Sequence, residues 1–244
     1  MFELLGFGLI TGFVSGFFGV GGGMILVPML LMIGFVMKEA VAISIMQMVF
    51  SSIYGSFLNI KKAKDVLKDG IIIGIGGFVG GLQSGYIVSN VSNEVLQYLF
   101  IFILVFAIVR IFYSPAEQLD SEKKAQKKVL LFILGFIIGI IAMSIGVGGS
   151  ILLTPFLVGF LKYDLKAATA LGLFFVIFSS VAGFISQSAQ GLMLYEEGAT
   201  VAIASLIGVY FGIKAKNVVK ATSYKKFILT LYVLILITML YKTI

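Results

Sequence analysis

The sequence predicts an all-α polytopic membrane protein built from two inverted-topology repeats of about five helical segments each. Three observations support this fold class. The chain of 244 residues is 60% hydrophobic and only 12% charged, with a mean hydropathy of +1.13, whereas soluble domains are close to a quarter charged. Its apolar segments are hydrophobic all round at helical length. A glycine-rich break occurs twice, at matching places in the two halves.

The apolar segments are expected to be helices, because lipid cannot bond free backbone groups and alternating strands of a barrel are absent. In the first half they are Leu4–Phe18, Met24–Val36, Ala40–Ile60, Gly70–Val88 and Val95–Tyr113. In the second half they are Val129–Ile145, Ile151–Leu161, Ala167–Ser186, Ala199–Ile213 and Phe227–Tyr241. A polar, proline-containing stretch separates the halves, so the predicted units are a first repeat 1–113, a linker 114–128 and a second repeat 129–244.

The repeat is clearest around the glycine-rich break. Gly12–Gly23, followed by Pro28, matches Gly139–Ser150, followed by Pro155, at a constant offset of 127 residues (139 − 12). The match continues in the third segment of each half, where the offset is 128 (177 − 49), over Val49–Gly55 and Ile177–Gly183. A glycine interruption at corresponding places of two halves is the best sequence pointer to a transporter's binding site.

The distribution of lysine predicts the orientation in a cell membrane. Loops 61–69, 110–128 and 214–226 carry four, five and five basic residues, whereas loops 89–94 and 188–198 carry none. Basic loops tend to remain in the cytoplasm. The amino terminus is therefore expected outside and the linker inside, and the second half starts from the opposite side to the first, which makes the repeats inverted.

The first two segments of each half are expected to turn back inside the bilayer. Met24–Val36 spans about 20 Å at ~1.5 Å per residue, and Ile151–Leu161 spans less, against a hydrocarbon core of roughly 30 Å. The glycine breaks would then meet near mid-membrane, one approaching from each side.

Each glycine break leads directly into a helix. The first amides of a helix lack intrahelical partners and carry a partial positive charge, and glycine permits close approach, so these positions favour an anion. The alternative is that the glycines only allow close helix packing, which is the interpretation adopted for Gly77, Gly81, Gly85, Gly208 and Gly212. The predicted substrate-binding residues of the breaks are Gly21, Gly22, Gly23, Gly148, Gly149 and Ser150.

A second set of predicted substrate-binding residues lies in the middle of the third segment of each half: Gln47, Ser51, Ser52, Ser179 and Ser180. Polar groups there should face the protein interior, because an unpaired hydroxyl in lipid is costly. Two interpretations stay open. The side chains line a polar path, or the hydroxyls bond back to carbonyls of the preceding turn or across helices.

Several functions are disfavoured by what the sequence lacks. There is no cysteine and no histidine, and no charged residue at the centre of a segment, so a carboxylate relay, a metal site, a cofactor and an enzymatic nucleophile are not expected. The net charge of +7 comes from loop lysines, which insertion explains without a nucleic-acid partner.

The duplicated pattern at Gly12–Pro28 and Gly139–Pro155 resembles the TauE/SafE sulfite exporter family, over essentially the whole chain. The second copy departs from the pattern at Met143, where the first has Gly16, and at Ser150, where the first has Gly23. The resemblance implies a permease of the bacterial or archaeal cytoplasmic membrane that moves small anions, such as sulfite, sulfonates or organosulfur carboxylates.

The predicted function is therefore alternating-access transport of a small, sulfur-containing anion between two inverted repeats. The predicted partners are this anion and the lipid bilayer. The oligomeric state stays open, with a homodimer as one option. The alternatives are a passive anion channel, which the missing ionisable relay would suit, and a non-transporting membrane subunit of a larger complex.

Overall fold

The computed structural model describes residues 1–19, 21–59, 67–113, 127–161, 163, 165–216 and 221–243. Every regular element in this part of the chain is an α-helix, as the sequence predicts. The centres of the lysine-rich loops and residues 114–126 of the linker, on which the orientation was predicted, lie outside the described residues.

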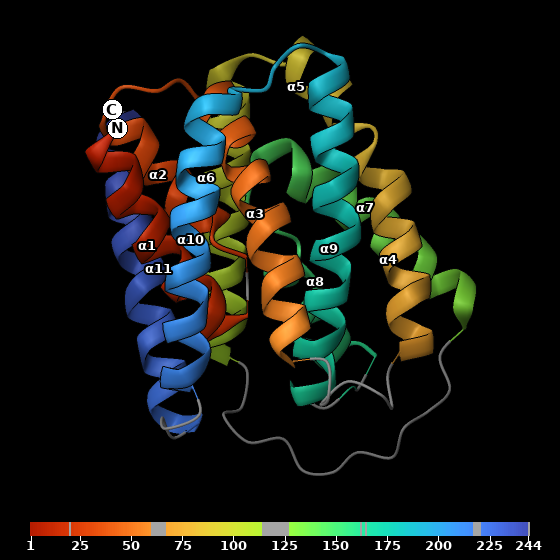
Figure 1. The fold of residues 1–244 in the computed structure, drawn as a ribbon. Coiled ribbons are helices and arrows are strands. Elements are labelled where there is room, and N and C mark those ends of the chain that lie inside the picture. Colours follow the sequence, from red (N-terminus) through yellow and green to blue (C-terminus); the bar gives the residue numbers. More distant parts are fainter. Residues whose placement is uncertain are drawn as a thin grey trace.

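The helices follow the predicted segments closely (Figure 1). The first half contains α1 Phe2–Phe18, α2 Gly23–Met32, α3 Met37–Asn59, α4 Leu67–Gly81, α5 Ser84–Asn90 and α6 Asn93–Tyr113. The second half contains α7 Lys128–Ile145, α8 Ser150–Gly159, α9 Leu165–Ala189, α10 Tyr195–Lys216 and α11 Ala221–Thr243. Both short helices, α2 and α8, have 10 residues, about 15 Å at ~1.5 Å per residue and half the thickness of a hydrocarbon core.

The fourth segment requires a correction. The sequence predicts one helix over Gly70–Val88, but the structure divides it into α4 and α5. At the division, the hydroxyl of Ser186 on α9 accepts a hydrogen bond from the Gly85 N–H (2.9 Å) and donates one to the Leu82 carbonyl (2.6 Å). A neighbouring helix therefore satisfies backbone groups near the break, which apolar surroundings otherwise make costly.

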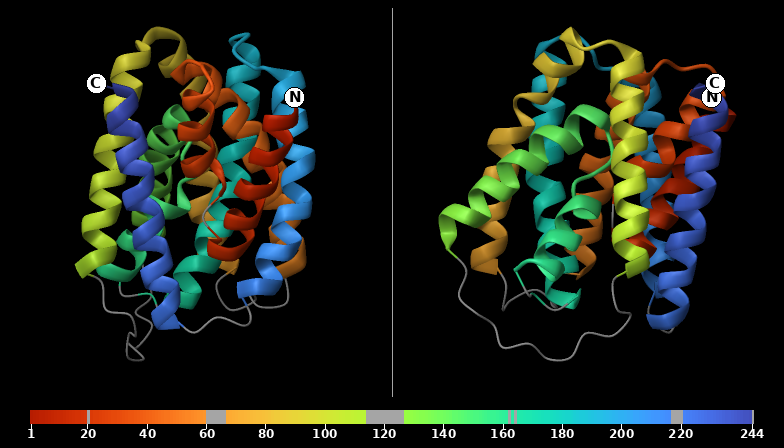
Figure 2. Two further views of the ribbon diagram at one scale, coloured as in Figure 1. Left: turned by 90° about the vertical axis from the view of Figure 1, so that its left-hand side faces the viewer. Right: turned by 180° about the vertical axis from the view of Figure 1, so that it is seen from behind.

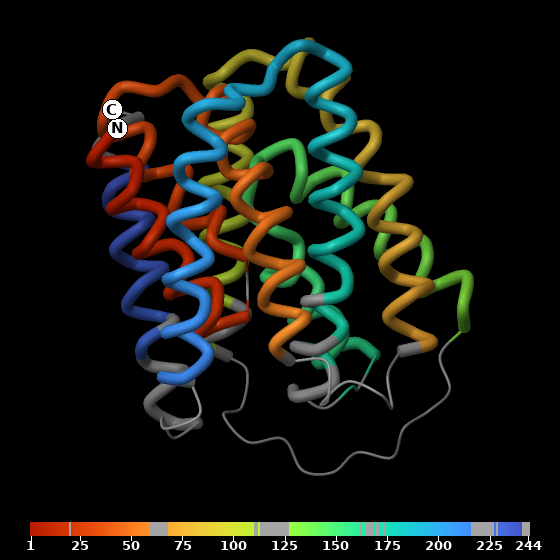
Figure 3. The backbone as a smooth tube through the Cα atoms, viewed as in Figure 1, coloured from red at the N-terminus to blue at the C-terminus, as the bar shows by residue number. Residues whose placement is uncertain are grey.

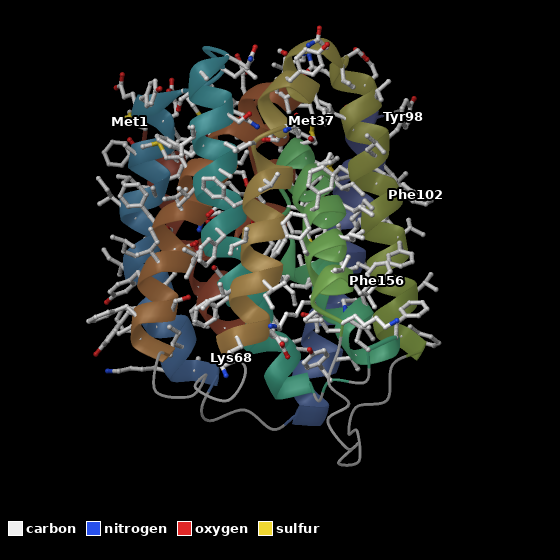
Figure 4. All side chains as sticks on the ribbon, turned by 90° about the vertical axis from the view of Figure 1, so that its right-hand side faces the viewer. Met1, Met37, Lys68, Tyr98, Phe102 and Phe156 are labelled. Atoms are coloured by element: carbon white, nitrogen blue, oxygen red, sulfur yellow. The ribbon has the colours of Figure 1, made fainter. Side chains whose placement is uncertain are left out.

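By length and composition, four helical stretches of the described residues are able to cross a membrane: Met37–Leu58, Lys68–Asn90, Lys128–Ile145 and Tyr195–Ala215. The outer faces of the helices are apolar. Tyr98 and Phe102 point away from the bundle on α6 (Figure 4), with 60% and 66% of their surface exposed. Such a surface is costly in water and natural in lipid.

The two ends of the molecule differ in which loops they carry. The helix ends that flank the three lysine-rich loops all lie at one end, and the loops without lysine lie at the other, together with both termini (Figures 1 and 3). The alternation of rich and poor loops predicted from the sequence therefore corresponds to two opposite ends of one bundle.

The first two helices of each half form a pair that turns back at the glycine break (Figure 2). α1 runs away from the end that carries the termini, and α2 returns toward it. α7 begins at the opposite end, and α8 returns there. The two glycine breaks are thus the inner turns of two helix pairs that enter the bundle from opposite ends.

The closest helix packing joins the two halves of the chain. α1 packs along α10, and its counterpart α7 packs along α4. Glycine makes both approaches possible: a Cβ on Gly12 would collide with the Ser205 carbonyl oxygen, and one on Gly80 would collide with the Phe136 carbonyl oxygen. The expectation that Gly208 and Gly212 serve packing is confirmed, since a Cβ on either would meet the backbone of α1.

This packing arranges the helices in two bundles that each mix both halves. α10 joins α1, α2 and α3, and α4 with α5 joins α7, α8 and α9. The second bundle has a further tie, because the Tyr163 hydroxyl after α8 donates to Asp69 Oδ2 at the start of α4 (2.8 Å). Burial, and then the Asp69 carboxylate, raise the pKa of Tyr163 above its ordinary value. The two bundles meet chiefly where α3 packs against α9.

Candidate functional site

Two glycines of each break have matching backbone conformations. Gly19 and Gly146 end α1 and α7 with φ of 68° each, and two residues later Gly21 and Gly148 have φ of 63° and 74°. These left-handed conformations favour glycine. The loop that follows α1 (residues 19–23, the first loop) and the loop that follows α7 (residues 146–150, the second loop) are therefore equivalent turns.

The loops contact each other in the interior of the protein. A Cβ on Gly21 would lie 3.6 Å from the Gly148 Cα and 3.3 Å from the sulfur of Met48 on α3. Gly23 lies against the Gly146 carbonyl oxygen so closely that a Cβ would collide with it. The predicted meeting of the two breaks is therefore seen, and the described residues of both loops are buried.

Each loop presents a helix amino terminus without a side-chain cap. The N-cap residues are Gly22 for α2 and Gly149 for α8, which have no side chain to form a cap, and no side chain of the described residues bonds either helix start. The first N–H groups of α2 and α8 have no intrahelical acceptors. Two uncapped, buried helix starts are costly unless something accepts from their amides, and an anion does so with the support of the helix dipole.

The first loop faces an amide side chain. A Cβ on Gly22 would lie 2.7 Å from Gln47 Nε2 and 2.8 Å from Gln47 Oε1, and 2.8 Å from the Thr11 carbonyl oxygen. Gln47 is fully buried, and neither its Nε2 nor its Oε1 finds a hydrogen-bond partner among the described residues. The structure therefore brings the predicted Gln47 to the predicted Gly22.

The second loop faces an aromatic ring. A Cβ on Gly149 would collide with the ring of Phe175 on α9, which is fully buried. Phe175 is the counterpart of Gln47 at the offset of 128 residues (175 − 47). Sequence reasoning missed it, although the repeat alignment that identified the serine pairs also places this phenylalanine opposite the glutamine.

The two loops differ in which helix carries the serine of a serine–glycine contact. In the first loop Gly23 lies against Ser44 on α3, whose hydroxyl donates to the Gly146 carbonyl of the second loop (2.7 Å). In the second loop the serine is on the short helix and the glycine on the long one, because a Cβ on Gly172 would lie 2.9 Å from the Ser150 Cβ. The Ser150 hydroxyl is buried and finds no partner among the described residues.

The predicted serine pairs are buried, but their hydroxyls bond within their own helices. Ser51 donates to the Met48 carbonyl (3.4 Å) and Ser179 to the Phe175 carbonyl (2.8 Å). Ser52 and Ser180 donate in the same way, to carbonyls three residues back, at 3.3 Å each. Of the two interpretations left open, back-bonding to the preceding turn describes this structure.

Other parts of the described chain offer less. No group of three metal-ligating side chains occurs among the described residues. A pocket of about 370 Å³ lies at the end that carries the termini, lined by Met1, Glu3, Leu4, Ile33, Phe35, Glu196 and Glu197. None of the residues of the two loops lines it.

Comparison with known proteins agrees with the duplicated glycine pattern. The family model described as sulfite exporter TauE/SafE matches residues 4–239. This chain belongs to the TauE/SafE family. Membership makes it a multi-pass membrane transporter of a family that is not an enzyme family.

Three relatives of this TauE/SafE protein carry transporter names. "Probable membrane transporter protein YunE" of Bacillus subtilis is 23% identical over 94% of this chain and 92% of the relative. "Probable membrane transporter protein MJ0441" of Methanocaldococcus jannaschii is 32% identical over 73% of this chain and 69% of the relative. "Probable membrane transporter protein YdhB" of Bacillus subtilis is 20% identical over 85% and 87%. No solved structure matches the chain.

Proposed function

We propose that this TauE/SafE protein is a permease that moves a small oxyanion, preferably one containing sulfur, across the cell membrane by alternating access. The observation that carries the proposal is the contact of two buried, uncapped helix starts from opposite halves of the chain. They offer backbone N–H groups to an anion without any charged side chain. The family name, sulfite exporter, supports the choice of a sulfur oxyanion.

The proposed orientation has the termini outside and the linker 114–128 in the cytoplasm. The support is the separation of lysine-rich and lysine-free loops to opposite ends of the bundle (Figure 1). The halves then form inverted-topology repeats, since α1 and α7 begin at opposite ends. In this arrangement the glycine loops lie near mid-membrane.

We further propose that the bodies that rock against each other are the two mixed bundles. α1 packs on α10, and α7 packs on α4, through glycine contacts so close that an added Cβ would collide with the neighbouring helix. The interface of α3 with α9 is the main contact that remains between the bundles. Movement at this interface would open the loops to one end and then to the other.

The function is tested with purified protein in proteoliposomes. Uptake of radiolabelled sulfite, a sulfonate and a small carboxylate should saturate with concentration and be accelerated by anion on the opposite side, as a carrier requires. Flux that neither saturates nor trans-stimulates would identify a channel. Absence of flux and of binding for every anion would contradict the proposal.

The chain lacks cysteine, so cross-links can test the moving bodies directly. A cysteine pair that joins α4 to α9 within one bundle, at Gly70 and Phe174, starts from a Cβ separation of 3.5 Å, which suits a disulfide, and should leave transport largely intact once oxidised. A pair that joins α3 to α9 should stop it reversibly. Loss of transport with both pairs would mean that the sequence repeats themselves move apart, because each pair joins one repeat to the other.

A further inference from the structure

The amide of Gln47 is more than the fold requires. Both of its polar atoms are buried without a partner in the described part of the chain, and each such group destabilises a protein by about 1–3 kcal/mol. The equivalent position in the other half holds Phe175, which is also fully buried. An apolar side chain therefore packs well at this place in the architecture. A glutamine that costs stability and faces a helix start is best explained by a ligand.

A second polar side chain beside the first loop already has a partner. The Ser44 hydroxyl donates its proton to the Gly146 carbonyl. The Gly22 carbonyl accepts from the N–H groups of Ile25 and Leu26, so the amides ahead of Ile25 are the donors of this helix start that have no acceptor among the described residues. With Gln47 they form a set of several N–H donors and an unpaired side-chain acceptor, the carboxamide oxygen.

An anion that has no hydrogen-bond donor satisfies only part of this set. Its oxygens accept from the helix amides and from Gln47 Nε2, but Gln47 Oε1 is left beside a negative charge. Exchanging the positions of Oε1 and Nε2 does not help, because both atoms lack partners and a carboxamide always has one acceptor and one donor side.

We infer that the first loop and Gln47 select an oxyanion that also carries a hydrogen-bond donor, such as a hydroxyl, an ammonium group or the proton of a monoprotonated oxyanion. This inference rests on the proposed function and specifies its substrate class. The anionic oxygens bind the α2 amides and Gln47 Nε2, and the donor binds Gln47 Oε1. A site built to pair a donor rejects the analogue that lacks it, because its own acceptor then stays unpaired.

The test compares two sulfonates that differ in one hydroxyl group, 2-hydroxyethanesulfonate and ethanesulfonate. Their dissociation constants are measured by calorimetry with the purified full-length protein in detergent. We expect the hydroxylated anion to bind at least about tenfold more tightly, as one further buried hydrogen bond provides. This first comparison needs only the wild-type protein.

Variants locate the effect. In Gln47→Met the ratio of the two constants should fall to within about twofold, and the ligand-free protein should melt at a higher temperature, since two unpaired groups are gone. If Gln47 had a purely structural role, its replacement would instead lower the melting temperature. Phe175→Met is the matched control in the other half and should keep the wild-type ratio. Gln47→Leu repeats the measurement if the methionine variant does not fold.

The outcomes separate the inference from the proposed function. Equal binding of the two sulfonates by wild-type protein, or an unchanged ratio in Gln47→Met, overturns the inference and leaves anion transport standing. If neither sulfonate nor any other anion binds, the proposed function fails and the inference fails with it.

Discussion

The first and second glycine loops share their glycine conformations but contact different side chains. Gly21 and Gly148 share a left-handed conformation, and both loops lead into helices of 10 residues. Around the first loop stands the unpaired amide of Gln47, and around the second stands the ring of Phe175. The geometry that presents N–H groups is shared by the two halves. The side chain on the neighbouring helix, α3 or α9, determines whether the loop binds a polar ligand.

The difference teaches that a twofold backbone need not provide two binding sites. The unpaired amide of Gln47 destabilises the protein unless a ligand forms hydrogen bonds with it, whereas the ring of Phe175 needs no hydrogen-bond partner. We therefore expect the second loop to act as a rigid support, held by the Ser44 hydroxyl through the Gly146 carbonyl, and the first loop to hold the anion.

The largest effects should follow from filling the glycine positions. Gly22→Ala and Gly149→Ala should each reduce flux to background and lower stability by about 1–3 kcal/mol, because the interior has no room for the methyl group. Flux in proteoliposomes and thermal unfolding in detergent measure both effects. Wild-type flux in both variants would contradict the assignment of the site.

Second-site changes then sharpen the comparison. Phe175→Leu should relieve Gly149→Ala and restore flux, since the obstacle is one ring. Gln47→Ala should not relieve Gly22→Ala, because the Thr11 backbone carbonyl still lies 2.8 Å from the new methyl group and the amide is lost. Equal rescue at the two loops would show that their walls are equivalent.

Phe175→Gln would place a glutamine beside the second loop, as Gln47 lies beside the first. The substitution removes a packed ring and buries an amide, so we expect a loss of about 3 kcal/mol or more in the free energy of unfolding. Denaturant unfolding followed by circular dichroism measures it. A variant as stable as the wild type would mean that the second loop also accommodates a polar group.

A smaller effect is expected from the exchanged hydroxyl. Gly172→Ser places a Cβ 2.9 Å from that of Ser150 and should cost about 1–2 kcal/mol. The double variant with Ser150→Gly should recover most of that loss, because it recreates the arrangement of Gly23 and Ser44. Additive losses in the double variant would show that the two pairs are not interchangeable.

The smallest effects belong to the hydroxyls that already have partners. Ser44→Ala removes the hydrogen bond to the second loop and should lower stability by about 1 kcal/mol. Ser51→Ala and Ser179→Ala are the controls. They lose only bonds within their own helices and should change unfolding and flux very little. A strong loss of flux in either control would return the serine pairs to the list of direct ligands.

Much of the fold was predictable because its signals are local in the chain. Apolar segments predicted the helices to within a few residues, and the short Ile151–Leu161 segment became α8. The break between α4 and α5 was not predictable, since no proline marks it. It depends on Ser186, a residue of another helix that supplies the missing hydrogen bonds. At the counterpart position 58, Leu58 has no such hydroxyl, and α10 is continuous.

The candidate site divides in the same way. Glycine spacing located both loops, and the repeat showed that they are equivalent. The distinction between them was not visible, because Gln47 and Phe175 act through contacts with residues about 25 positions away (47 − 22 and 175 − 149, or 25 and 26). The serine pairs were identified as polar and interior, but only the structure could show where their protons go.

By itself the sequence determined the membrane class, the twofold repeat, the uneven distribution of lysine and the position of the glycine loops. Hydrophobic length, glycine conformation and loop charge are properties that each segment carries alone. The tertiary structure decided that α10 packs with α1 and α4 with α7, and that an amide faces one loop and a ring the other. Those outcomes depend on which distant helices can approach closely, and no single segment contains that information.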